Sequence, residues 1–156
     1  MAATLNAARE EFMRHMYRDT SIAERTRLLA VLDAVIEWSA AHPESVRFRP
    51  DENSKGMIRF EETTTHSVFW TATPRRQNSP LLQLLPGGAR LLTDDVRADA
   101  VNRLNSCTRE DNPAEKMHIG FGALKNLEGR AAVFQLMDEL LERLQPATSG
   151  SVATKS

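Results

Sequence analysis

Arginine alternates with apolar residues in two short segments, Val46-Arg47-Phe48-Arg49 and Ile58-Arg59-Phe60-Glu61. Guanidinium groups stay charged and bind carboxylates and phosphates through paired hydrogen bonds. A period of two is typical of a β-strand with one buried face and one solvent-facing face. If the two segments form a hairpin, Arg47 or Arg49 lies near Arg59, with Glu61 and Glu62 as partial counter-charges. The pattern predicts a basic sheet face that binds an acidic partner, either nucleic acid or protein.

Three further features could extend this surface. Residues 67–72 read as a strand in which Phe69 and Thr71 share one face, opposite to Val68, Trp70 and Ala72. An outward Phe69 would place an aromatic ring beside the arginines, a combination that follows phosphates and stacks bases. Further basic or polar side chains are expected from the hairpin tip at 74–80 and from the last strand: Arg75, Arg76 and His118. The alternative interpretation is a solvated face whose arginine stems cover apolar surface.

A glycine-containing run offers a second candidate site. Gly120 and Gly122 precede Lys125 and Asn126, between an expected strand and an expected helix. Free amides at a helix N-terminus together with a lysine can bind an anion, which would suit a small ligand or an enzyme substrate. Lysine stands where the third glycine of a dinucleotide fingerprint belongs, so that motif is not matched. The alternative is a tight turn in which the glycines permit close packing.

No motif for catalysis or for a metal site is recognisable. Histidines stand at 15, 42, 66 and 118, without the spacing of metal ligands, and Cys107 is the single cysteine. A structural zinc site needs four nitrogen or sulfur ligands. Cys107 falls on the apolar stripe of an expected helix and is interpreted as an inert, buried thiol. The sequence therefore favours a non-catalytic protein without metal or cofactor.

Length and composition predict one globular domain over 1–146, with a disordered polar tail over 147–156. The net charge is −1, yet residues 45–90 contain seven basic and four acidic residues. The basic charge therefore coincides with the strand-forming part of the chain. No apolar run has the length of a membrane span. With one cysteine and no recognisable signal peptide, we expect a cytoplasmic protein that does not bind membranes.

Hydrophobic periodicity predicts four helices and five strands. The helices are expected at 4–17, from Ser21 to about 41, from Thr93 to about 107, and at 127–144 after Asn126, and the strands at 45–49, 57–61, 67–72, 81–85 and 117–121. Ser21 with Glu24 forms a capping box, and Thr93 and Asn126 are expected as N-caps. Consecutive strands joined by short loops favour an antiparallel meander.

The expected fold class is therefore α+β, with the helices mainly on one face of the sheet. Its C-terminal helix carries apolar residues at coiled-coil spacing, Val133, Met137, Leu140 and Leu144. Core packing is the main interpretation of this stripe, and the seam of a homodimer is the alternative. The preferred function is a small binding domain that uses the exposed, basic sheet face.

Overall fold

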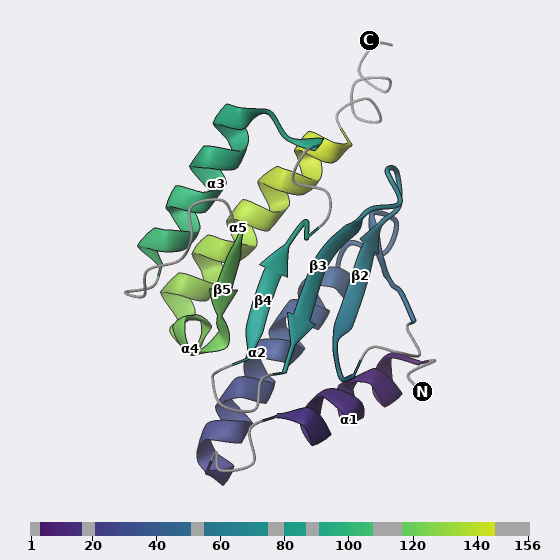
Figure 1. Cartoon of the computed structure of the whole chain (residues 1–156), viewed down its shortest axis with the longest axis vertical. Helices are drawn as coiled ribbons and strands as arrows, with labels where there is room; N and C mark the ends of the chain where they lie inside the picture. The colour runs from purple at the N-terminus through teal and green to yellow at the C-terminus, as the bar shows by residue number, and fades with distance from the viewer. Residues whose placement is uncertain are drawn as a thin grey trace.

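The computed structural model describes residues 4–16, 21–50, 55–74, 80–86, 91–107 and 117–145. Figure 1 shows the arrangement of these segments. Arg75 and Arg76 of the expected hairpin tip, and the expected tail at 147–156, lie outside the described residues.

Helices form where apolar stripes follow good N-caps. The helices are α1 (Leu5–His15), α2 (Ile22–Ala40), α3 (Asp94–Ser106), α4 (Phe121–Leu124) and α5 (Leu127–Leu144). The Ser21 hydroxyl accepts a hydrogen bond from the Glu24 amide at 3.1 Å, and Thr93 and Asn126 cap α3 and α5 in the same manner. The three predicted N-caps are confirmed, whereas the Glu24 carboxylate pairs with Lys125 and Arg27 instead of completing the capping box. The four-residue α4 was not predicted; it begins at Phe121, where we expected the last strand to continue.

Five strands form one antiparallel sheet in the order β1-β2-β3-β4-β5. The strands are β1 (Val46–Phe48), β2 (Ile58–Glu62), β3 (Val68–Thr73), β4 (Leu81–Leu84) and β5 (His118–Gly120). Each strand lies beside its predecessor, even where α3 intervenes between β4 and β5. The predicted α+β meander is confirmed.

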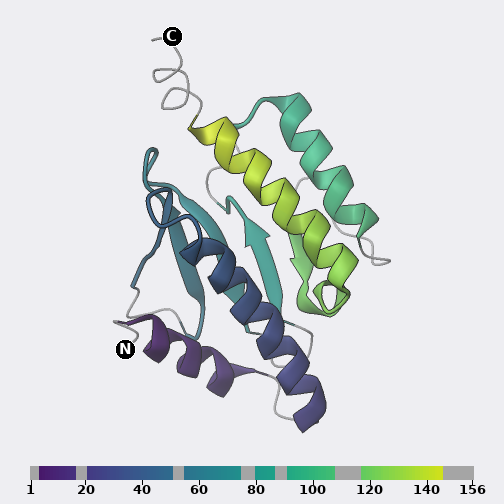
Figure 2. The ribbon, with the colours of Figure 1, turned by 180° about the vertical axis from the view of Figure 1, so that it is seen from behind.

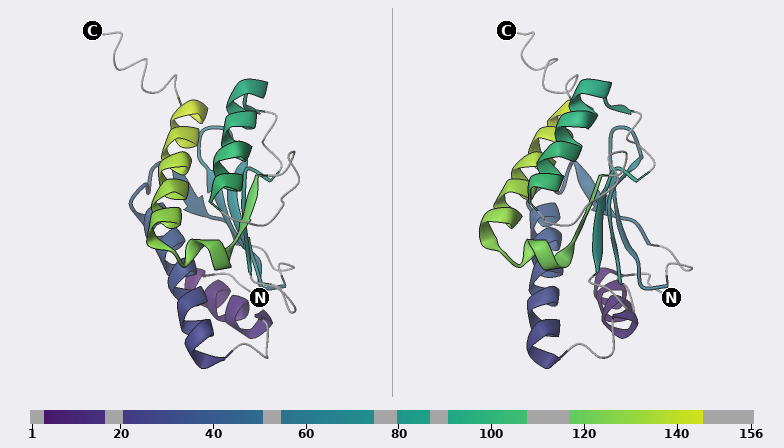
Figure 3. Two further views of the ribbon diagram at one scale, coloured as in Figure 1. Left: turned by 90° about the vertical axis from the view of Figure 1, so that its left-hand side faces the viewer. Right: turned by 60° about the vertical axis from the view of Figure 1, so that its left-hand side comes forward.

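Helices α2 and α5 lie against the same face of the sheet (Figures 2 and 3). Helix α3 packs beside α5 and along the β5 edge, whereas α1 lies near the end of β2. The opposite face, toward the viewer in Figure 1, has no described helix across it. The helices are thus mainly on one face, as predicted, and the face without a helix is called the open face below.

The helix-covered face holds the aromatic part of the core. Trp70 is fully buried, its ring stacks on Phe60 at 4.7 Å, and its Nε1 donates a hydrogen bond to the Ser39 hydroxyl of α2 at 2.8 Å. The indole therefore gains both ring packing and a partner for its N–H group, which a buried tryptophan requires.

Phe69 also faces the helices, which excludes the outward orientation considered from the sequence. The pairing of β2 with β3 changes register, from Phe60 opposite Trp70 to Glu61 opposite Val68, so Phe69 is the extra residue of a β-bulge. Its side chain is fully buried and stacks on Trp38 of α2 at 5.6 Å between ring centroids. Strict alternation fails at this bulge, and Phe69 does not add a stacking ring to the open face.

The apolar stripe of α5 packs into the core of this chain. Val133, Met137 and Leu140 are at most 1% exposed, and Leu144 is 8% exposed. Core packing, the main interpretation of this stripe, is therefore confirmed. These side chains are covered, so we do not propose a homodimer through them.

A buried carboxylate joins the β2–β3 turn to the end of α5. Glu62 accepts hydrogen bonds from the Thr64 and Thr65 amides, each at 2.7 Å, from the Thr65 hydroxyl at 2.6 Å, and from the Gln145 side-chain amide. Burial alone raises the pKa of Glu62, but the hydrogen bonds from Thr65, Thr64 and Gln145 favour the ionised form and bring the pKa below its usual value. Glu62 is thus a structural anchor and not a counter-charge on the arginine face.

This anchor predicts a pH dependence of stability. Because the folded-state pKa is lowered, the ionised Glu62 stabilises the fold above the unfolded pKa of about 4.3, and this contribution is lost as the pH falls through the folded pKa. Glu62→Gln should cost about 1–3 kcal/mol at pH 7, since buried donors lose a charged acceptor. In urea titrations from pH 7 to pH 3, we expect this difference to shrink as wild type loses stability. A constant difference across the range would contradict the assignment.

Candidate functional site

The register of the sheet aligns Arg49, which directly follows β1, with one polar residue from each of the other four strands in a row on the open face. The Arg49 amide donates to the Arg59 carbonyl oxygen at 3.0 Å, which places these two residues opposite each other at the end of β1. Pairing continues from Arg59 to Thr71, from Thr71 to Gln83 and from Gln83 to His118. The predicted proximity of Arg49 and Arg59 is therefore present. One row runs across the whole sheet.

The row is basic and exposed at its β1 end. Arg47 and Arg49 are exposed and Arg59 is half-buried, whereas Thr71 is only 5% exposed. His118 shares the face and the row but lies on β5, three strands from Arg59. That is about 14 Å at the usual strand spacing of about 4.8 Å. The arginines gather as predicted, and His118 stands apart from them.

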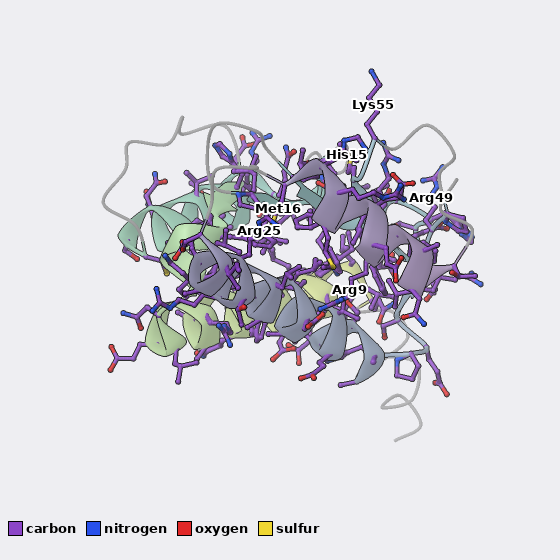
Figure 4. All side chains as sticks on the ribbon, turned by 90° about the horizontal axis from the view of Figure 1, so that it is seen from below. Arg9, His15, Met16, Arg25, Arg49 and Lys55 are labelled. Carbon is purple, nitrogen blue, oxygen red and sulfur yellow. The ribbon has the colours of Figure 1, made fainter. Side chains whose placement is uncertain are left out.

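Lys55 adds a positive charge that the sequence analysis did not single out. It lies in the turn before β2 with φ of +54°, followed by Gly56 with φ of +89°. A side chain at Gly56 would approach the His15 Cβ atom of α1 to 3.0 Å, so the turn is fixed closely against that helix. Lys55 projects from the side of the sheet opposite α2, whereas Arg9 lies toward α2 (Figure 4). We call Arg47, Arg49, Lys55 and Arg59 the hairpin patch.

Glu61 introduces one negative charge among these cations. It stands opposite Arg47 across the strands, and its carboxylate lies 3.9 Å from Arg49 Nε and 3.2 Å from His66 Nδ1. Its side chain is 19% exposed, compared with 51% for Arg49. The patch with Glu61 therefore has four positive charges and one negative charge. Its charge is mixed, with a cationic excess.

The residues of the alternative site are engaged in structural contacts. Lys125 Nζ lies 2.6 Å from a Glu24 carboxylate oxygen of α2, and the Asn126 side chain accepts hydrogen bonds from the Glu128 and Gly129 amides. Gly120 ends β5, and the exposed Gly122 lies within α4. An anion would have to displace both Glu24 and the Asn126 cap. The geometry favours a packed connection over an anion site.

A groove of about 490 Å³ lies elsewhere, between the start of α3 and the end of α5. Leu92 and Val96 line it together with Glu139, Glu142 and Arg143. Nearby, the Arg103 guanidinium donates to Glu139 at 2.6 Å, and this hydrogen bond lowers the pKa of Glu139. The hydroxyl of Thr93, which also lines the groove, is engaged as the N-cap of α3, so the described lining pairs no nucleophile with a base.

Within the described segments, no three histidine, cysteine, aspartate or glutamate side chains are grouped so that they could hold a metal ion. Cys107 is half-buried at the end of α3, with its Sγ 3.3 Å from the Arg103 carbonyl oxygen. None of the described helices combines the length and hydropathy that a membrane crossing requires.

Comparisons of the chain with protein-family models, with curated proteins and with solved structures found no match. The geometry and charge of the hairpin patch are therefore the main indication of function.

Proposed function

We propose that this chain is a non-catalytic binding domain whose hairpin patch binds an acidic macromolecule. The observation that carries the proposal is the placement of Arg49 directly opposite Arg59, on a sheet face that no described helix covers. Like charges opposite each other in neighbouring strands lower stability. Glu61, 3.9 Å from Arg49 Nε, offsets part of this repulsion, and carboxylates or phosphates of an anionic partner would offset more of it.

The flanking residues support the same function. Arg47 and Lys55 are exposed on the same hairpin and add to its positive charge. Arginine binds carboxylates or phosphates through a planar array of donors, and it is enriched at protein interfaces. Binding that depends on such contacts weakens as salt screens the charges.

The test compares two triple variants with the same loss of charge. Arg47→Ala/Arg49→Ala/Arg59→Ala removes the patch arginines, and Arg27→Ala/Arg97→Ala/Arg143→Ala removes three arginines from α2, α3 and α5. Fluorescence anisotropy would follow binding to a labelled glutamate-rich peptide and to a labelled single-stranded oligonucleotide at low salt. We expect the patch variant to lose about 10- to 100-fold in affinity for the bound probe, since each exposed ion pair contributes up to about 1 kcal/mol.

The matched variant should bind within about twofold of wild type, because its arginines lie outside the patch. Thermal melting would confirm that both variants are folded. Equal losses in the two variants would mean that net charge alone drives binding, which contradicts a dedicated patch. Retained affinity in the patch variant would also refute the proposal.

A further inference from the structure

The hairpin patch differs from a simple phosphate-binding surface in its charge pattern. Glu61 lies among the cations, opposite Arg47 and 3.9 Å from Arg49 Nε. An ionised carboxylate and a phosphodiester oxygen are both acceptors only, so neither can donate to the other. A phosphate chain laid along the arginines would therefore face repulsion at Glu61. A protein surface can place acids opposite the arginines and a donor opposite Glu61.

The described strands also place no phenylalanine or tryptophan ring on the open face. Phe48 and Phe60 are paired opposite each other, and Phe60 stacks on Trp70 of the core. Phe69 stacks on Trp38 of α2. All four phenylalanine and tryptophan residues of the described strands therefore lie on the helix-covered side. Single-strand recognition gains much of its affinity from stacking on exposed rings, which these strands do not offer.

The edge of the sheet limits how a partner can approach. Residues of β1 alternate between bonding to β2 and facing outward, and Arg49 bonds inward to Arg59. Among the outward positions, the Val46 amide already donates to the His42 carbonyl oxygen at 3.1 Å, and Pro50 has no N–H group. Of residues 46–50, Phe48 alone has an outward amide that donates to no described residue. The β1 edge therefore offers few amide donors to an added strand of a partner. Side-chain contacts on the open face are favoured instead.

From these three observations we infer that the partner is the acidic surface of a protein, and that Glu61 is a specificity-determining residue that disfavours nucleic acid. The inference rests on the proposed function of the hairpin patch. The partner surface carries carboxylates that meet Arg47, Arg49 and Arg59, together with a hydrogen-bond donor that meets Glu61. A partner whose charges all have the same sign, such as a phosphate chain, fits the patch less well.

The experiment measures the preference between two probes of equal net charge. One is a labelled peptide rich in glutamate and serine with interspersed lysine, and the other is a labelled single-stranded oligonucleotide. For wild type we expect the peptide to bind at least about tenfold more tightly at the same salt concentration. Glu61→Gln keeps the size of the side chain and removes its charge. It should raise oligonucleotide affinity about fivefold and change peptide affinity less, because one close like-charge contact disappears.

Glu139→Gln on α5 is the matched control, because it removes the same charge outside the patch and should leave the preference unchanged. Patch-dependent binding that favours the oligonucleotide would overturn the inference and leave the proposed function standing. An unchanged preference in a folded Glu61→Gln variant would overturn the role of Glu61. If neither probe binds wild type at low salt, the proposed function falls and the inference falls with it.

Discussion

Leu140→Asp should unfold the domain. Leu140 is 1% exposed on α5, within the same core as Met137 and Leu144. A carboxylate placed there has no partner, so it must be desolvated, protonated or exposed by unfolding. We expect a loss of at least about 4 kcal/mol, comparable to the whole stability of a small domain. Circular dichroism would show no cooperative thermal transition.

Ala132→Asp is the control for this prediction, because it introduces the same residue at an exposed position of α5. Its cost should stay below about 1 kcal/mol, which is the range of helix propensity. If Leu140→Asp melted at the wild-type temperature, α5 would not pack on the sheet as described.

Trp70→Ala should have the second-largest effect. The change removes a fully buried ring that stacks on Phe60, together with the hydrogen bond from Nε1 to the Ser39 hydroxyl. Truncation of a buried tryptophan costs about 3–5 kcal/mol, because it loses apolar transfer energy and leaves a cavity. Urea denaturation, followed by the fluorescence of the remaining Trp38, would measure the loss.

Two milder variants separate ring packing from the hydrogen bond. Ser39→Ala keeps the ring but leaves the buried indole N–H without its acceptor, which should cost about 1–3 kcal/mol. Trp70→Phe keeps an aromatic ring and should cost less than Trp70→Ala. A loss below about 1 kcal/mol in Trp70→Ala would show that α2 is not held against β3 by this contact.

Local patterns predict most of the fold because secondary structure and burial share the same periodicities. The capping box at Ser21, the stripe of α5 and the alternation in β2 each correspond to an observed element. Alternation does not predict the face on which Phe69 lies, because one extra residue in β3 turns two consecutive aromatic side chains toward the helices. A bulge depends on the register between two strands, and no single segment encodes that register.

The candidate site is predictable only in part. Alternation correctly places the three arginines together on the open face, because they belong to one hairpin. His118 shares the face, but the position of β5 at the far edge depends on how five strands are ordered. Glu62 resembles Glu61 in the sequence, yet it is buried because the β2–β3 turn folds its amides onto the carboxylate. Lys55 could have been noticed beside Gly56 as a turn residue of the same hairpin.

Mapping of amide chemical shifts on the isotope-labelled protein, during titration with the glutamate-rich peptide at low salt, tests the central claim most directly. The hairpin patch predicts that the largest shifts fall at residues 46–50, 55 and 58–61 and that they diminish as salt is added. Shifts concentrated at Gly120–Asn126, or along the groove between α3 and α5, would contradict binding through the hairpin patch.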